Sequence, residues 1–205
     1  MYIPHRYKND NLEEVRGFIQ HNSFGLLISQ AATGLTATHI PLELDKNEAG
    51  KDVLAGHISR GNPQWKNFAD QSRVLAVFSG PHAYISSSWY DHENVPTWNY
   101  IAVHVYGTIT IIEGERLVDM LSKLVRKYEA GSERPVAVET MDPVFLHNQV
   151  KGIVGFEIEI EEIQAAYKLS QNRDEVNHSN IVRELEKQTD PQALAIAAEM
   201  KKHKA

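Results

Sequence analysis

Residues 98–112 read WNYIAVHVYGTITII, and this stretch predicts one long β-strand. From Ile101 to Ile111 every second residue is apolar, except that Gly107 has no side chain. A period of two is typical of a strand that buries one face, whereas an amphipathic helix repeats every three to four residues. β-Branched and aromatic residues, which favour sheets, dominate the run. We therefore expect a mainly β fold.

Shorter runs flank this strand on both sides. They predict strands at residues 24–29, 35–44, 53–58, 74–79, 83–86 and 150–163. Helical spacing predicts helices at residues 12–19, 115–129 and 141–147, and two more in a tail after the candidate N-caps Ser179 and Asp190. Gly80-Pro81 is expected to break the fourth strand. Because strands and helices do not alternate regularly, the pattern favours a mainly antiparallel barrel with helices at its ends.

The composition limits the classes of function. The chain has 205 residues and no cysteine, which excludes disulfides, thiolate metal sites and a cysteine nucleophile. Its net charge is −6 without a long Lys/Arg run, which disfavours broad affinity for nucleic acid. The polar N-terminus and the lack of a long apolar run predict a cytoplasmic protein with no membrane association.

The first candidate binding stretch is GHISRGNPQW, residues 56–65. Here a strand ends in Ser59-Arg60-Gly61, and Asn62-Pro63 opens a short helix. One guanidinium, one hydroxyl and the free amides of a helix start suit an anion the size of phosphate. The alternative is a capped turn that carries a surface arginine.

The second candidate stretch is Gly80–Tyr100, which is rich in aromatic and small polar residues. Flat aromatic side chains beside hydroxyl and amide groups suit a planar heteroaromatic ligand. A dimer interface has a similar composition, so both interpretations stay open, and one surface can serve both purposes.

The sequence gives little support for a metal site, a serine hydrolase or a nucleotide-binding motif. No His-Glu-x-x-His motif or close histidine pair indicates a metal, and we expect none. Gly-x-Ser-x-Gly, Gly-x-Gly-x-x-Gly and Walker motifs are absent from the sequence. No catalytic residue can be assigned, although His82, Tyr84 and Tyr100 are candidate proton donors. The glutamates at 157, 159, 161 and 162 are interpreted as the solvated face of a strand.

Short motifs distributed along the chain occur together in one order: MYIP (1–4), THIPL (38–42), GHISRGNPQW (56–65), YIS (84–86) with WY (89–90), VPTWNY (95–100) and KLSQNR (168–173). Together they resemble the PaiB family of FMN-binding split-barrel proteins, described as negative transcriptional regulators. Ser59 and Gly61 stand where that family often has alanine, which should not change the chemistry.

The resemblance implies a Greek-key split β-barrel with peripheral helices, which forms a homodimer and binds FMN at the dimer interface. Arg60 and Ser59 would hold the phosphate, while Thr36, Ala37 and Thr38 would flank the ring. Trp98 and Asn99 would reach across from the partner subunit. The remaining predicted cofactor-binding residues are His57 and Trp65. Residues 1–168 would form the split-barrel domain, and residues 169–205 a loop and helical tail packed on the barrel or on the partner.

The resemblance further implies repression of genes for sporulation and for degradative enzymes, notably proteases. The lysines at 201, 202 and 204 are the candidate DNA contact, unless the tail packs on the barrel or the partner. A second regulatory protein is the other possible partner. Two alternatives remain: an FMN-dependent oxidoreductase of the pyridoxamine-phosphate-oxidase-like class, and an interaction dimer whose flavin site is vestigial.

Overall fold

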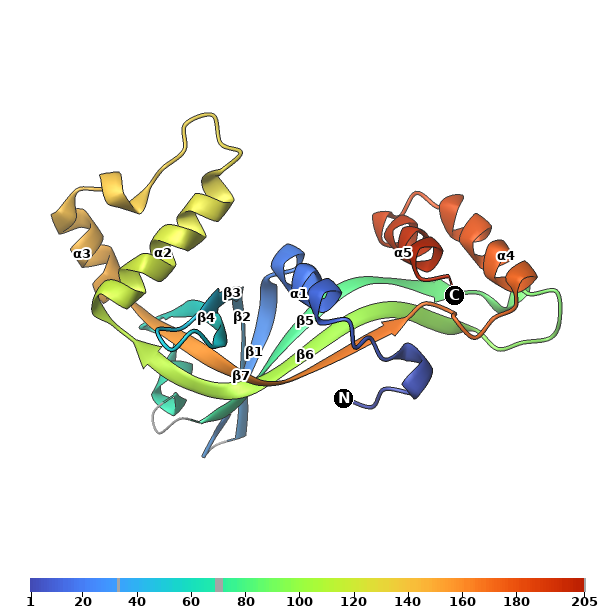
Figure 1. The fold of residues 1–205 in the computed structure, drawn as a ribbon, viewed down its shortest axis with the longest axis horizontal. Coiled ribbons are helices and arrows are strands. Elements are labelled where there is room, and N and C mark those ends of the chain that lie inside the picture. Colours follow the sequence, from blue (N-terminus) through green and yellow to red (C-terminus); the bar gives the residue numbers. More distant parts are fainter. Residues whose placement is uncertain (33, 69–71, 205) are drawn as a thin grey trace. The chain divides into compact units, whose positions relative to one another are not determined.

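A computed structural model describes residues 1–32, 34–68 and 72–204 of the chain (Figure 1). Its strands are β1 (Phe24–Ala31), β2 (Gly34–Pro41), β3 (Glu43–Lys46), β4 (Asp52–Ser59), β5 (Arg73–Ile85), β6 (Thr97–Ile112) and β7 (Ile153–Lys168). Its α-helices are α1 (Leu12–His21), α2 (Gly114–Glu129), α3 (Pro143–Lys151), α4 (Glu175–Glu186) and α5 (Pro191–Lys202). Short 3₁₀ helices cover His5–Tyr7, Pro63–Asn67, Ser87–Trp89 and Val138–Thr140.

The strands form one seven-stranded sheet in the order β2-β1-β5-β6-β7-β4-β3. Antiparallel pairing joins β1 to β2 and β5, and joins β4 to β3 and β7. The predicted antiparallel sheet with peripheral helices is therefore confirmed, although helices contribute about as many residues as strands do. No helix among the described residues has both the length and the apolar character that a membrane span requires.

Strand β5 runs without a break through Gly80-Pro81, so the expected interruption is wrong. Proline lacks an amide hydrogen and weakens a strand that is paired on both edges. Here the pairing of β5 with β1 ends at Val77, before the proline is reached. Gly80 allows α1 to approach closely, because a Cβ at this position would lie 2.5 Å from Cε2 of Phe18.

Two helix starts show where capping can be predicted from sequence. Asp190 caps α5 as expected, because its side chain accepts a hydrogen bond from the amide of Gln192. Helix α4 begins earlier than expected, with Asp174 rather than Ser179 as its N-cap. The side chain of Asp174 accepts a hydrogen bond from the amide of Asn177, which satisfies one of the free amides of the first turn.

The chain folds into two compact units. Unit 1 contains Met1–Phe18, Phe78–His104 and Gln164–Ala205, and unit 2 contains Ile19–Val77 and Val105–Ile163. The long strands β5, β6 and β7 each contribute residues to both units. The division into domains at residue 168 stays a prediction.

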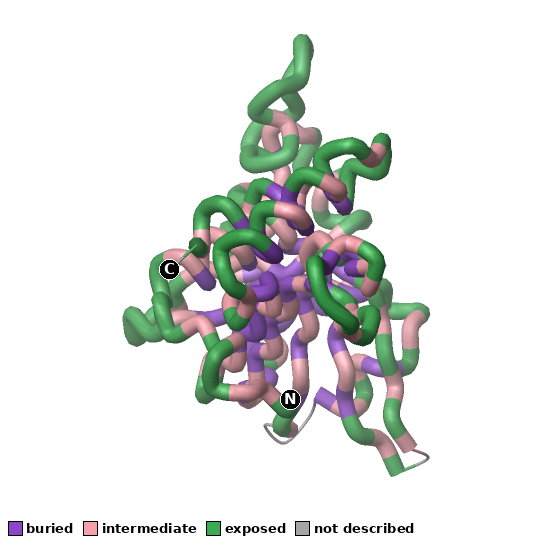
Figure 2. The backbone as a smooth tube through the Cα atoms, turned by 90° about the vertical axis from the view of Figure 1, so that its right-hand side faces the viewer, coloured by how far each residue is buried: buried purple, intermediate pink, exposed green. Residues whose placement is uncertain are grey.

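Unit 2 carries a hydrophobic core, and Figure 2 shows buried segments gathered in the interior with exposed segments around them. Phe156 is fully buried and meets Phe68 edge to face, with ring centroids 5.2 Å apart. Complete burial of one such side chain contributes about 2–3 kcal/mol. Strand β4 approaches the end of β2, because a Cβ on Gly56 would lie 3.0 Å from the carbonyl oxygen of Pro41. The sheet therefore curls towards closure, as in a barrel.

Unit 1 is held together by contacts between residues far apart in the sequence. The amide nitrogen of Asn99, on β6, donates hydrogen bonds to Ser170 Oγ at 3.0 Å and to Met200 Sδ at 3.4 Å. Met200 lies on α5 and is fully buried. The last helix is therefore part of the core of this unit.

An ionic cluster joins α1 to the end of α5. Glu14 accepts hydrogen bonds from Lys202 and from Asn9, and its Oε1 lies 2.9 Å from Nε2 of His203. Burial of Glu14 opposes its ionisation, but the hydrogen bonds from Lys202, Asn9 and His203 outweigh burial and lower the pKa of Glu14 to about 2. The carboxylate therefore stays ionised at neutral pH and keeps α1 attached to the tail.

Candidate functional site

Strand β2 carries the three residues predicted to flank a flavin ring. Thr36 and Thr38 are half-buried, whereas Ala37 is exposed on the opposite face. Thr38 Oγ1 donates to Oε1 of Gln64 at 2.5 Å and accepts from Nδ2 of Asn62 at 2.9 Å. The structure therefore connects the predicted ring strand directly to the predicted phosphate turn.

Gln64 makes this connection, although sequence reasoning gave it no role. It is 1% exposed, and its Nε2 lies within hydrogen-bonding distance of the Leu27 carbonyl (3.2 Å), Ser29 Oγ (3.1 Å) and the Thr36 carbonyl (3.2 Å). Gln64 lies two residues after the cap Asn62, and its amide donates a hydrogen bond to the Asn62 side chain. The only signal in the sequence was its place within the GHISRGNPQW motif.

The predicted phosphate turn follows β4. The Ser59 carbonyl accepts from the Asn62 amide at 2.9 Å, and the exposed Ser59 Oγ accepts from the Gly61 amide at 3.2 Å. Asn62 then caps the 3₁₀ helix Pro63–Asn67, with proline at its first position. A hydroxyl, a turn and a helix start therefore lie together, as the sequence predicts.

Arg60 is exposed, but its side chain is held in place by hydrogen bonds to two backbone carbonyls. Its Nε donates to the Lys151 carbonyl and its Nη2 to the Ile153 carbonyl, both at 2.9 Å. Trp65 supports it, with Nε1 donating to the Arg60 carbonyl at 3.0 Å and the ring centroid 5.7 Å from the guanidinium carbon. Two of the three guanidinium nitrogens are thus engaged. Only Nη1 has no acceptor within the described ranges.

His57 lies on β4, opposite Gly155 of β7. Burial lowers its pKa below the ordinary value, because a charged imidazolium would lose its hydration there. His57 is therefore neutral at pH 7, and it can donate one hydrogen bond and accept another. This residue, Ser59, Arg60, Trp65 and the β2 threonines all belong to unit 2.

The predicted residues of β6 belong to unit 1 and separate onto two faces. Trp98 is 53% exposed and packs against Tyr84, with ring centroids 5.8 Å apart, and against His82 at 6.1 Å. Asn99 is fully buried, with its amide bonded to Ser170 and Met200. The expectation that both residues reach a partner subunit therefore needs correction. Successive residues of a strand point to opposite faces, so only Trp98 is available for such a contact.

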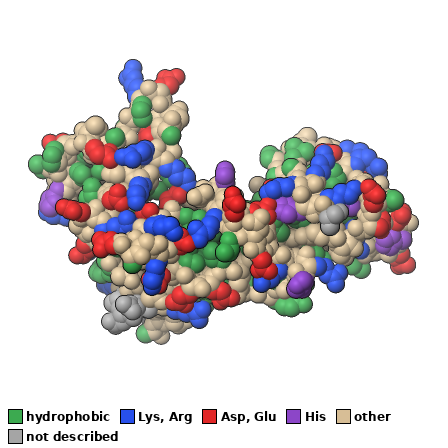
Figure 3. Space-filling model, in the orientation of Figure 1, with side chains coloured by type: hydrophobic (Ala, Val, Ile, Leu, Met, Phe, Trp, Pro, Cys, Tyr) green, Lys and Arg blue, Asp and Glu red, His purple; other side chains and the backbone are tan. Residues whose placement is uncertain are grey.

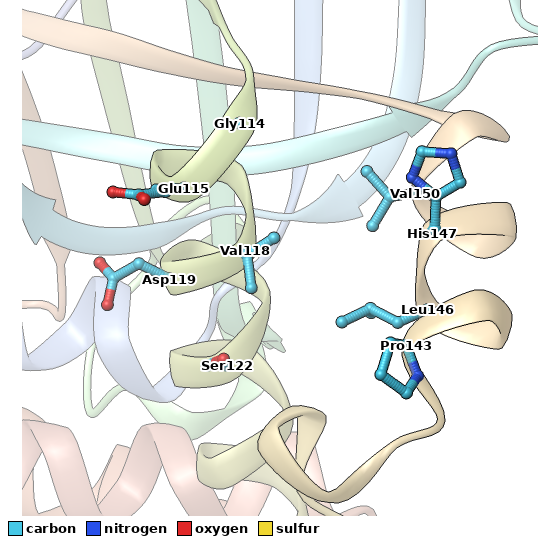
Figure 4. Close-up of a pocket in the computed structure, with 9 residues that line it drawn as sticks. All are labelled: Gly114, Glu115, Val118, Asp119, Ser122, Pro143, Leu146, His147 and Val150. Carbon is cyan, nitrogen blue, oxygen red and sulfur yellow. The ribbon is translucent and has the colours of Figure 1, made fainter.

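A separate hollow lies between α2 and α3, with a volume of about 680 Å³. Figure 4 shows Val118 of α2 directed towards Leu146 and Val150 of α3, whereas Glu115 and Asp119 point away from α3. None of the predicted cofactor-binding residues lines this hollow. Asp119 is already paired with Arg116 and Lys123, at 3.1 and 3.0 Å.

One cluster in the described part of the chain has the composition of a metal site. Ligand atoms of Glu14, Glu199 and His203 all lie within 4.8 Å of one another. Lys202 donates a hydrogen bond to Glu14, so an ammonium group already supplies positive charge to this carboxylate. The cluster is therefore accounted for as the link between α1 and α5.

A family model described as "Putative FMN-binding domain" matches residues 1–162 of the chain. The chain is 46% identical to "Protease synthase and sporulation protein PAI 2" of Bacillus subtilis, over 96% of its own length and 95% of that protein. It is 36% identical to "Uncharacterized protein YKL070W" of Saccharomyces cerevisiae, over 63% of its own length and 90% of that protein.

Two solved structures share the fold. The FAD and heme binding protein from Mycobacterium smegmatis has a TM-score of 0.59 at 12% identity, covering 79% of this chain and 73% of that one. The flavocytochrome Anf3 from Azotobacter vinelandii has a TM-score of 0.60 at 16% identity, covering 85% of this chain and 76% of that one. These likenesses confirm the predicted fold class.

Proposed function

The chain belongs to the family described as "Putative FMN-binding domain", and from this premise we propose that it is an FMN-binding regulator of sporulation and of protease production. Membership of this family confirms the prediction of FMN as cofactor. The observation that carries the regulatory role is the likeness to the Bacillus subtilis PAI 2 protein, which extends over nearly the whole of both chains.

The residues of unit 2 fit a flavin phosphate. Arg60 has one free guanidinium nitrogen in a position fixed by two backbone carbonyls, and Ser59 adds an exposed hydroxyl. The strand Thr36–Thr38, connected to this turn through Gln64, would lie against the ring. FMN supplies one- or two-electron redox chemistry, and the protein supplies binding and orientation.

We infer that the protein acts as a homodimer and that the exposed Trp98 contacts the second copy. Trp98 and Tyr84 are 53% and 47% exposed and pack edge to face, so two aromatic side chains form one exposed apolar surface. Aromatic residues at the centre of an interface are typical contributors to binding free energy. This surface therefore supports the proposed homodimer.

Replacing Arg60 with alanine is expected to weaken FMN binding by about 1.5–3 kcal/mol, the contribution of a charge-assisted hydrogen bond. Riboflavin, which lacks the phosphate, should bind both proteins equally well. Quenching of flavin fluorescence in titrations with each flavin measures the difference. Arg126→Ala is the matched control, because Arg126 is 75% exposed and Glu139 is its one ion-pair partner among the described residues. Equal losses for FMN and riboflavin would show that Arg60 supports the fold rather than the phosphate.

Overproduction in a Bacillus subtilis strain that lacks the PAI 2 protein is expected to lower secreted protease activity and spore number. Casein hydrolysis and counts of heat-resistant spores measure both effects. Unchanged values with soluble protein present would contradict the regulatory role. Steady oxidation of NADH or NADPH by the FMN-loaded protein would instead favour an oxidoreductase.

The lysines of the tail give little support to direct binding of DNA, because each of them is paired with a glutamate. Lys201 pairs with Glu186, Lys202 with Glu14, and Lys204 with Glu175. Figure 3 shows acidic and basic side chains interspersed over the visible face. Neutralised lysines release few counterions from DNA, so we infer that the target of regulation is a protein partner.

A further inference from the structure

Lys168 ends β7 in unit 1 and is a cation without a carboxylate partner among the described residues. Its ammonium group donates a hydrogen bond to Oγ1 of Thr97 on the neighbouring strand β6. Burial lowers the pKa of Lys168 below the ordinary value, and the positive charge of Arg173 lowers it further. Two like charges therefore act on each other in a half-buried place, an arrangement that an anion would stabilise.

Arg173 is the second cation. Its backbone amide donates to the Ser170 carbonyl at 3.0 Å, which closes the turn between β7 and α4. Its guanidinium carbon lies 4.8 Å from the centroid of the Tyr90 ring. Stacking on a ring leaves the N–H groups at the guanidinium edge free, and none of them meets an acceptor in the described part of the chain.

Tyr90 supplies an independent observation. The residue is 9% exposed, and its hydroxyl is buried without a hydrogen-bond partner within residues 1–32, 34–68 and 72–204. Buried hydroxyl groups normally have a partner, because an unmade hydrogen bond costs free energy. The hydroxyl belongs to the same ring that Arg173 covers.

The nearest acidic residues in the sequence are engaged elsewhere. Asp174 caps α4 and accepts from the side chain of Asn177 at 2.8 Å. Asp91 lies 2.7 Å from Nδ1 of His92 and accepts from Asn177 at 2.9 Å. The carboxylates beside Tyr90 and Arg173 in the chain are thus turned to other partners.

We propose that Lys168, Arg173 and Tyr90 form a binding site for a phosphate-type oxyanion. The ammonium and guanidinium groups would supply the positive charge, and the tyrosine hydroxyl would supply a further donor. A tetrahedral dianion suits such a set, because it accepts several charge-assisted hydrogen bonds at once. The ligand is free phosphate or the phosphate of a phosphorylated small molecule. The inference does not depend on the flavin.

Calorimetric titration of the purified full chain with inorganic phosphate, in a phosphate-free buffer, tests the site. We expect one saturable site, at least a tenfold loss of affinity in Lys168→Met and in Arg173→Met, and a smaller loss in Tyr90→Phe. Lys187→Met is the control, because Lys187 lies in the same unit and already pairs with Glu184 at 2.7 Å. Melting temperatures show whether each variant keeps its fold.

Absence of saturable binding to the folded wild-type chain would overturn the proposal. An equal loss in Lys187→Met would overturn it as well, because it would indicate a general ionic effect. If Lys168→Met does not fold, Tyr90→Phe still removes one donor and decides the test.

The same titration with FMN-loaded protein identifies the source of the phosphate group. If FMN blocks phosphate binding, and the Lys168 and Arg173 variants lose affinity for FMN but not for riboflavin, the site holds the flavin phosphate. If phosphate still binds, the site takes a separate ligand. If the chain binds phosphate but does not bind FMN, the oxyanion site is supported and the proposed FMN-binding function is contradicted.

Discussion

Replacing Gly107 with alanine is expected to lower the free energy of unfolding by about 3 kcal/mol, the upper part of the usual range for overpacking. A Cβ at this position would lie 2.1 Å from the carbonyl oxygen of Glu159 and 2.8 Å from Cγ2 of Ile158. Both neighbours belong to β7, the strand beside β6 in the sheet. A backbone carbonyl within a paired strand cannot move without loss of its ladder, so the strain stays in the sheet. Urea unfolding followed by circular dichroism measures the loss.

Gly17→Ala is the matched control for this substitution. Gly17 lies within α1, and a Cβ there meets no atom within 4 Å. Alanine favours a helix over glycine by about 0.8–1.0 kcal/mol, so this variant should be more stable than the wild type. Equal stability of Gly107→Ala and the wild type would contradict the close approach of β6 and β7.

Gln64→Ala is expected to destabilise the protein by about 3 kcal/mol, because it leaves several buried polar groups without a partner. The Leu27 and Thr36 carbonyls and the Ser29 and Thr38 hydroxyls all lose a contact. The substitution also removes the links that Gln64 makes to Thr36 and Thr38, and leaves the hydrogen bond from Nδ2 of Asn62 to Thr38 Oγ1 as the side-chain link between this strand and the turn. We therefore expect FMN affinity to fall together with stability. Thermal unfolding and flavin titration measure the two effects.

Gln30→Ala provides the comparison, because Gln30 is an exposed glutamine of β1 whose side chain donates a hydrogen bond to the carbonyl of its neighbour Ala31. Its loss should change stability by less than about 0.5 kcal/mol, as is usual for surface positions. A Gln64 variant that is as stable as this control would show that the buried network adds nothing to the fold.

The bounds of an element could be predicted from the sequence where local periodicity or capping decides them. The alternation from Ile101 to Ile111 located β6 to within one residue at its start, since a period of two leaves little freedom. Asp190 followed by proline located the start of α5 for an equally local reason, namely side-chain capping.

Contacts between distant residues could not be predicted in the same way. Asn99 was expected at a subunit interface, but its partners Ser170 and Met200 lie 71 and 101 positions away. The anchoring of Arg60 depends on carbonyls 91 and 93 positions further along the chain. Composition and spacing predicted which residue types gather at the site. Only the fold could show which of their atoms remain free.

Unit 1 is assembled from three separate segments of the chain, and this determines when it can fold during synthesis. Asn99 packs against Met200, and Glu14 is held by Lys202 and His203, so segments that are far apart in the sequence meet in this unit. Every residue of unit 2 has been synthesised once Ile163 is in place. Unit 1 must wait for α5 to leave the ribosome. Until then Asn99 and the apolar faces around it remain open to chaperones, and a nascent chain that stalls after β7 is expected to be a substrate for them.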